Sequence, residues 1–223
     1  MAEPVVIALL GAQGTGKSTL AAALARRLAA ETGLRCTWVA EWQREWCERE
    51  GRAPRVDELA AIAREQHRRI EAAAAAHDVV LCDTTALATA VHSRLVFGDA
   101  SLEAPAVELH RARVQLSLLT ALDMPWSARG PWGDGERREP IDEALRRLLH
   151  AHRLPWVVVA GLGPRREEAA LDAIAALLRR GGLRRPDLFT RLAQREAAAR
   201  PCSWTCDKCD QPDCEHASRR RPG

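Results

Sequence analysis

The sequence predicts an α/β fold: a three-layer sandwich in which a parallel five-stranded sheet lies between two layers of helices. Two observations support this prediction. Short, mostly apolar segments alternate with longer segments of helical periodicity, and strands that are apolar on both faces are typical of parallel sheets. The first apolar segment also runs directly into a glycine-rich loop and then a helix. With 223 residues, the chain is long enough for one core domain and a small appendage.

The first half of the chain is expected to contain three strands and three helices. Leu20, Leu24 and Leu28 recur at a spacing of four, which predicts a helix after the first strand. Asp57 is expected to cap the second helix, because its carboxylate can accept hydrogen bonds from first-turn amides. Gly98 ends the third helix. The expected elements are strand 5–10, helix 17–30, strand 36–40, helix 57–77, strand 79–82 and helix 86–96.

The second half repeats the alternation. Pro140 and Pro164 are each expected to open a helix, because proline is tolerated in a first turn. Trp38 and Trp156 are expected in the core. Past Gly182 the composition shifts to Arg, Pro and Cys, which predicts a core domain over 1–182 and a tail over 183–223. The expected elements are a helix within 99–112, strand 114–120, loop 124–139, helix 140–152, strand 156–160 and helix 164–180.

The loop after the first strand fits the phosphate-binding pattern G-x-x-x-x-G-K-[ST]. Its glycines let backbone amides turn toward phosphate oxygens, and the new helix presents the positive end of its dipole. Lys17 is expected to reach the β- and γ-phosphates, and Ser18 to ligate Mg²⁺. The predicted fold is therefore of the P-loop NTPase type. The expected nucleotide-binding residues are Gly11, Ala12, Gln13, Gly14, Thr15, Gly16, Lys17, Ser18 and Thr19.

Acidic residues follow two of the expected strands. Asp83 comes directly after 79–82, at the carboxyl end of a parallel strand, where it is expected to hold Mg²⁺; the alternative is a cap for the next helix. Glu41 follows the second strand, with Arg44 three residues on. Such an acid can orient or deprotonate an acceptor hydroxyl, whereas the alternative is a solvated helix start with a surface Glu/Arg pair.

Several stretches resemble the ribosylnicotinamide kinase domain of the NadR type, an AAA-like group of P-loop ATPases and kinases. They are 11–20, Glu41-Trp42-Gln43-Arg44-Glu45-Trp46, Asp83-Thr84-Thr85 with Thr89 and Phe97-Gly98, and Asp123-x-Pro125-Trp126. The resemblance spans about residues 5 to 178. It implies a kinase-like strand order and phosphorylation of a small nucleoside-like acceptor, such as nicotinamide riboside, by ATP with Mg²⁺. It also implies that Glu41, Arg44 and Asp83 line the acceptor side.

The chain departs from this family at positions near the acceptor. Tyrosines usually stand where Trp42 and Trp46 do, and the position of Thr85 is usually acidic. Arg129 lies in the loop 124–139, where a lid would place an arginine against transition-state charge; the alternative is a solvated basic loop. A related group of ATPases without an assigned substrate shares the same motifs. The alternative function is an ATP-dependent regulatory switch that controls a partner through the tail.

The tail concentrates soft metal ligands. Five such residues lie within fifteen positions, which is more than the four ligands that a tetrahedral Zn²⁺ needs. The spacing Cys206-x2-Cys209 is typical of a zinc knuckle, so Zn²⁺ is the expected metal. The alternatives are an iron–sulfur cluster or incidental cysteines. These ligands are Cys202, Cys206, Cys209, Cys214 and His216.

The charge distribution limits the classes of partner. The net charge of +3 lies entirely in 181–223, which leaves a neutral body and argues against a nucleic-acid binder. No run of 18 apolar residues is present, so no membrane span is expected. A strand pattern that starts at Val5 leaves no signal peptide, and a cytoplasmic location is expected. The oligomeric state stays open, a homo-oligomer included.

Overall fold

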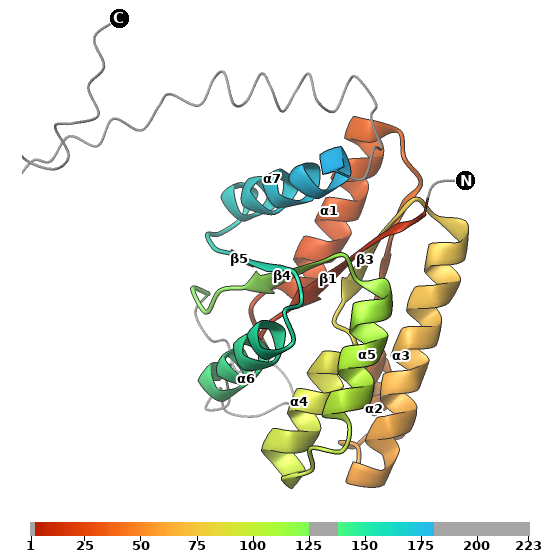
Figure 1. Cartoon of the computed structure of the whole chain (residues 1–223), viewed down its shortest axis with the longest axis vertical. Helices are drawn as coiled ribbons and strands as arrows, with labels where there is room; N and C mark the ends of the chain where they lie inside the picture. Colours follow the sequence, from red (N-terminus) through yellow and green to blue (C-terminus); the bar gives the residue numbers. More distant parts are fainter. Residues whose placement is uncertain (1–2, 125–137, 181–223) are drawn as a thin grey trace, which may run out of the picture.

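The computed structural model describes residues 3–124 and 138–180, which form a five-stranded parallel sheet with helices on both faces (Figure 1). The spatial order of the strands is β2-β3-β1-β4-β5. The predicted parallel sheet, its three layers and its kinase-like order are therefore confirmed. The strands are β1 (Val5–Leu10), β2 (Cys36–Val39), β3 (Val79–Asp83), β4 (Leu116–Thr120) and β5 (Trp156–Val159). The helices are α1 (Lys17–Thr32), α2 (Trp42–Glu50), α3 (Val56–Ala76), α4 (Ala86–Phe97), α5 (Glu103–Arg113), α6 (Arg138–Ala151) and α7 (Pro164–Arg180).

Strand β1 lies at the centre of the sheet, and its side chains point alternately into two cores. Val6, Ala8 and Leu10 pack with residues of α3, α4, α5 and α6. Ile7 and Leu9 pack with α1 and α7 on the other face, and Figure 1 shows these two helix layers on opposite sides of the sheet. Because both faces are covered, the whole strand is buried and needs an unbroken apolar sequence.

Helix α2 is absent from the predicted elements, because its sequence is mostly charged. Two of its side chains nevertheless form a small apolar cluster with α3: Trp46 and Cys47 pack with Leu59 and Ile62. This tertiary contact, rather than local periodicity, stabilises the helix beside the acidic residue that precedes it.

The start of α3 differs from the expected cap. Arg55, rather than Asp57, is the N-cap residue, and Asp57 lies in the first turn. Glu58 performs the capping, since its Oε2 accepts a hydrogen bond from the backbone N–H of Arg55 at 2.8 Å. Asp57 still contributes negative charge near the positive end of the helix dipole.

Two other expectations were wrong in detail. Trp38 is 40% exposed, because β2 is an edge strand with no neighbour beyond it among the described strands. Strand β4 begins at Leu116 rather than at residue 114, since the backbone of Val114 donates to His110 O and closes α5.

The carboxyl ends of β1, β3 and β4 lie side by side at one edge of the sheet, because all three strands are parallel and paired. Loops that leave these ends are where ligands bind in parallel α/β sheets. None of the helices in 3–124 and 138–180 is long and apolar enough to cross a membrane.

Candidate active site

Contacts with the surrounding protein fix the shape of the glycine loop between β1 and α1. Gly11 has φ 143°, and a Cβ at this position would overlap the side-chain oxygen of Thr120 on β4. Thr15 Oγ1 donates to Ala12 O at 2.8 Å and lies 2.7 Å from Thr120 Oγ1. Gly16 caps α1 in the left-handed conformation, with φ 77°. A left-handed residue before the helix lets the loop amides face an anion at the helix N-terminus.

Lys17 is the first residue of α1 and is almost fully buried. Its Nζ donates to Ala12 O at 2.9 Å, so the ammonium group lies across the mouth of the loop. Burial lowers the pKa of Lys17, while the negative charges of Glu41 and Asp83 act in the opposite direction. The three charged groups are therefore close enough to influence one another.

Asp83 ends β3 and is 1% exposed. Its Oδ1 is buried and has no hydrogen-bond partner within the described part of the chain. A buried carboxylate oxygen without a partner is costly, and a cation would satisfy it. The hydroxyl of Ser18, which accepts from Arg44 Nη1 at 3.2 Å, supplies a second hard oxygen of the kind Mg²⁺ prefers. These two residue types therefore fit a magnesium ion that also binds phosphate oxygens.

Glu41 comes directly before α2 and pairs with Arg44, whose Nη2 lies 3.0 Å from Glu41 Oε2. Burial raises the pKa of Glu41, and the like charge of Asp83 adds to this effect, whereas Lys17 and Arg44 oppose it. A carboxyl with a raised pKa is suited to accept a proton near neutral pH. Arg44 itself is about half exposed, so the surface pair that the sequence offered as an alternative is also present.

Several of the predicted residues line one cleft at this edge of the sheet. Lys17, Glu41 and Arg44 contribute charged groups, and Ile62, Val91 and Ile141 contribute an apolar wall. Clefts that combine an apolar wall with a few polar groups are typical of small-molecule sites. The full lining is Gly11, Gln13, Lys17, Glu41, Gln43, Arg44, Ile62, Gln66, Thr84, Ala88, Thr89, Val91, His92 and Ile141.

Gln66, which is 2% exposed on α3, is not among the residues predicted from the sequence. Its Oε1 accepts from Trp42 N at 2.7 Å, and its Nε2 donates to Ala40 O at 3.3 Å. Gln66 therefore holds the backbone on both sides of Glu41. A signal was available, because a polar residue stands at the buried spacing of four between Ile62 and Ile70.

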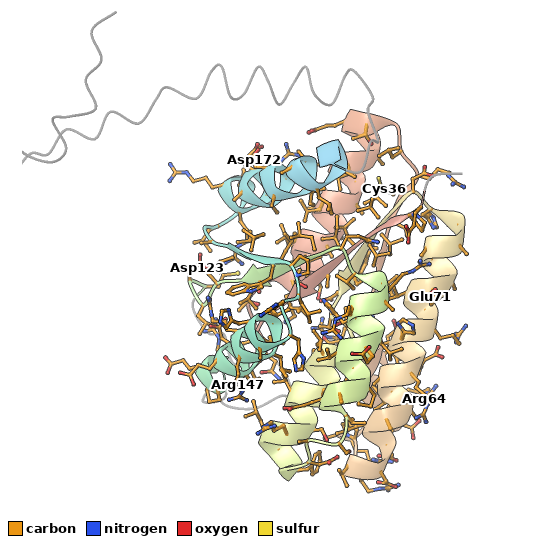
Figure 2. The ribbon with its side chains drawn as sticks, in the orientation of Figure 1. Cys36, Arg64, Glu71, Asp123, Arg147 and Asp172 are labelled. Atoms are coloured by element: carbon orange, nitrogen blue, oxygen red, sulfur yellow. The ribbon has the colours of Figure 1, made fainter. Side chains whose placement is uncertain are left out.

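Arg166 on α7 was also missed, although it is 4% exposed. Its Nη1 donates to Thr15 O at 2.5 Å, and its Nη2 pairs with Asp123 Oδ1. Asp123 Oδ2 in turn accepts from Gly161 N at 2.5 Å, and Figure 2 shows Asp123 beyond the end of β4. No local pattern in the sequence marks Arg166, because its two partners, Thr15 and Asp123, come from distant segments.

Several predicted residues lie apart from this cluster. Thr19 is exposed on the first turn of α1 and is not part of the cleft lining. Arg129 and the tail ligands Cys202, Cys206, Cys209, Cys214 and His216 lie outside the described residues.

Comparisons with known proteins agree with this geometry. A family model described as an AAA domain matches residues 6–166. A structure of NadR protein in complex with NR is 24% identical, with a TM-score of 0.63, and the match covers 78% of this chain and 50% of that one. NadR protein in complex with NAD and AMP-PNP is 25% identical, with a TM-score of 0.62 and coverages of 78% and 49%.

A third structure, thymidylate kinase from Ehrlichia chaffeensis, is 14% identical with a TM-score of 0.53, and the match covers 78% of this chain and 98% of that one. The chain spans about half the length of the two NadR structures. No curated protein sequence matches the chain. These findings confirm the P-loop kinase fold and the resemblance to NadR.

Proposed function

The chain belongs to the AAA domain family whose model matches residues 6–166, and from this premise we propose that it transfers the γ-phosphoryl group of ATP to a small nucleoside-like acceptor. Nicotinamide riboside is the first candidate. The observation that carries the proposal is the meeting of Lys17, from the phosphate loop, with Glu41 and an apolar wall in one cleft. The NadR complexes with NR and with AMP-PNP support both the nucleotide and the acceptor.

Each charged residue would have one role in this reaction. Lys17 would bind the phosphoryl group, and burial of this side chain lowers its pKa. Mg²⁺, held by Ser18 and Asp83, would offset charge on the β- and γ-phosphates. Glu41 would orient the acceptor hydroxyl and take its proton as that oxygen bonds to the γ-phosphorus and the bond to ADP breaks. Arg44 would keep Glu41 in place through their ion pair.

The acceptor side of the cleft suits a flat ring with polar substituents. Ile62, Val91 and Ile141 offer apolar contact area, while Gln43 and His92 offer hydrogen-bonding groups. These polar side chains would orient the ring through hydrogen bonds. The combination of apolar wall and polar groups supports an acceptor with a flat ring, such as a nucleoside.

The test is mass spectrometry of the products after incubation with ATP, Mg²⁺ and a pool of nucleosides that includes nicotinamide riboside. The expected result is one acceptor heavier by a phosphoryl group, with an equal amount of ADP. Lys17→Ala should remove this product, and Arg68→Ala, which deletes an exposed cation on α3, should not. A Lys17→Ala protein as fast as the parent would contradict the proposal, and ADP without a phosphorylated acceptor would favour the ATPase switch.

We also propose that the tail binds Zn²⁺ through its cysteines and His216. Metal analysis of protein purified without chelators should find about one zinc per chain. The double variant Cys206→Ser/Cys209→Ser should lose it. The matched control is Cys36→Ser/Cys47→Ser, which removes two thiols of the core domain. Equal metal content in both double variants would contradict the assignment.

A further inference from the structure

Thr84 has a backbone conformation that its side chain disfavours. Its φ is 70°, and Thr84 and Arg153 are the two non-glycine residues with positive φ in 3–124 and 138–180. The left-handed region is strained for any residue with a Cβ and most strained for a β-branched one. Thr84 is also 5% exposed and directly follows Asp83. A flexible surface turn therefore does not account for the conformation.

The surrounding structure holds this turn on both sides. The backbone N–H of Thr84 donates to Leu9 O on β1 at 3.1 Å. The next residue, Thr85, caps α4 by accepting from Leu87 N at 3.4 Å, and its hydroxyl lies 3.1 Å from His110 Nδ1. His110 Nε2 is in turn 2.9 Å from Ser117 Oγ on β4. The turn is thus fixed by contacts to β1, α4, α5 and β4.

His110 can fill this place because it is neutral. It is 2% exposed, and burial lowers its pKa to about 4. A neutral imidazole has one donor and one acceptor nitrogen, so it can bond both hydroxyls at once. The hydrogen bonds that form this buried chain, Thr85–His110–Ser117, involve none of the charged residues of the proposed reaction. Its position suggests a role in supporting the turn next to it.

The strained residue faces the cleft. Thr84 is one of the lining residues, together with Lys17 and Glu41, and within the described residues no hydrogen bond involves its hydroxyl. Strained conformations persist where the surroundings over-determine them, and they cluster at ligand sites. A hydroxyl without a partner in a ligand cleft is ready to bond a ligand atom.

We propose that Thr84 is a specificity-determining residue whose hydroxyl hydrogen-bonds the acceptor, and that His110 is the positioning residue that keeps the turn strained. The inference rests on the proposed function and deepens it. It implies an acceptor with a polar group beside its reacting hydroxyl, as a ribose provides. Nucleotide binding does not depend on this contact.

The test compares four variants with the parent, with nicotinamide riboside as the acceptor probe. Thr84→Val removes the hydroxyl but keeps the shape, and should lower kcat/KM for the acceptor about fivefold to tenfold while KM for ATP stays constant. Thr84→Ser should recover most of that loss. Thr84→Gly should also lose acceptor turnover without a fall in the melting temperature, because the strain is relieved. The matched control, Arg153→Gly, relieves the same kind of strain away from the cleft and should leave turnover unchanged.

The role of His110 is tested by comparing KM for the acceptor with KM for ATP. His110→Leu should raise KM for the acceptor and leave KM for ATP unchanged, whereas His110→Asn, which retains a group near the Thr85 hydroxyl, should recover part of the loss. Calorimetric titration of nicotinamide riboside in the presence of AMP-PNP should show the same order of affinities. Full acceptor turnover in Thr84→Val would overturn the inference alone. A parent protein that phosphorylates no nucleoside would overturn the proposed function, and this inference with it.

Discussion

Arg166 Nη1 donates a hydrogen bond to the backbone oxygen of Thr15 at 2.5 Å, so helix α7 is tied directly to the glycine loop. The same guanidinium pairs with Asp123, which in turn accepts from Gly161 N. The loops that follow β1, β4 and β5 are thereby joined through one buried arginine.

Replacement of this arginine should therefore affect both stability and nucleotide binding. Arg166→Ala removes a nearly buried cation, and Asp123, which is 32% exposed, would recover only part of its hydration. We expect the free energy of unfolding in urea to fall by about 2–3 kcal/mol. AMP-PNP affinity should weaken, because Thr15 O loses its donor. The matched control Arg68→Ala deletes an exposed ion pair on α3 and should cost at most about 1 kcal/mol. Equal losses in the two variants would refute this role.

Gly11 is expected to be the least replaceable glycine of the loop. Alanine there would combine φ 143° with an overlap on Thr120, so Gly11→Ala should lose about 2–4 kcal/mol of stability and about 5–10 °C in melting temperature. Gly98→Ala is the control, because φ is also positive there but nothing lies within 4 Å of the added carbon. It should cost only about 1 kcal/mol. Differential scanning calorimetry distinguishes the two, and similar melting shifts would mean that the contact with Thr120 is unimportant.

The raised pKa of Glu41 predicts an opposite pH trend for stability and for activity. Between its ordinary pKa and the raised one, the folded protein holds a proton that the unfolded chain releases. The parent should therefore lose stability relative to Glu41→Gln as pH rises through that window. Activity should rise in the same window, and the variant should lack this acid limb. Urea unfolding and pH–rate profiles measure both trends, with the exposed Glu48→Gln on the same helix as the control. Parallel stability curves for parent and Glu41→Gln would contradict the assignment.

His110 should make the protein sensitive to mild acid. Its folded-state pKa of about 4 lies below the ordinary value of 6.5, so its contribution to stability is complete above pH 6.5 and is lost as pH falls toward 4. The slope should be about 1.4 kcal/mol per pH unit, or roughly 3 kcal/mol across the window. His110→Asn should start less stable at pH 7 but lose less on acidification. The exposed His150→Gln should follow the parent. If His110→Asn also follows the parent, the imidazole does not carry the acid sensitivity.

The sequence predicts most of the fold because the signals are local. Strand β1 has the expected bounds, since a strand covered on both faces must be apolar at every position. The glycine loop is equally local, because its shape depends on residues that tolerate positive φ. Helix α2 escapes prediction because its sequence is charged and its stability comes from Trp46 against α3.

The site is only partly predictable, because some of its residues are held by contacts between distant parts of the chain. Lys17, Glu41 and Asp83 follow strands, and the topology alone brings them to one edge of the sheet. Arg166 bonds Thr15, and His110 bonds Thr85, both far away in the sequence, so the burial of the arginine and the histidine cannot be anticipated from their neighbours. The strain at Thr84 depends on contacts to β1 and on the cap of α4, which no periodicity reveals.

The order of the strands also governs how the chain must fold. Val5 pairs with Val79, and Ile7 pairs with Leu116, so the central strand has no neighbour that is close to it in the sequence. Such non-local pairing makes folding slow, because long loops must close before any sheet contact forms. Thr120 supports the glycine loop only after β4 has paired with β1. A nucleotide therefore cannot guide the early steps of folding. ATP would instead slow unfolding by binding the completed sheet.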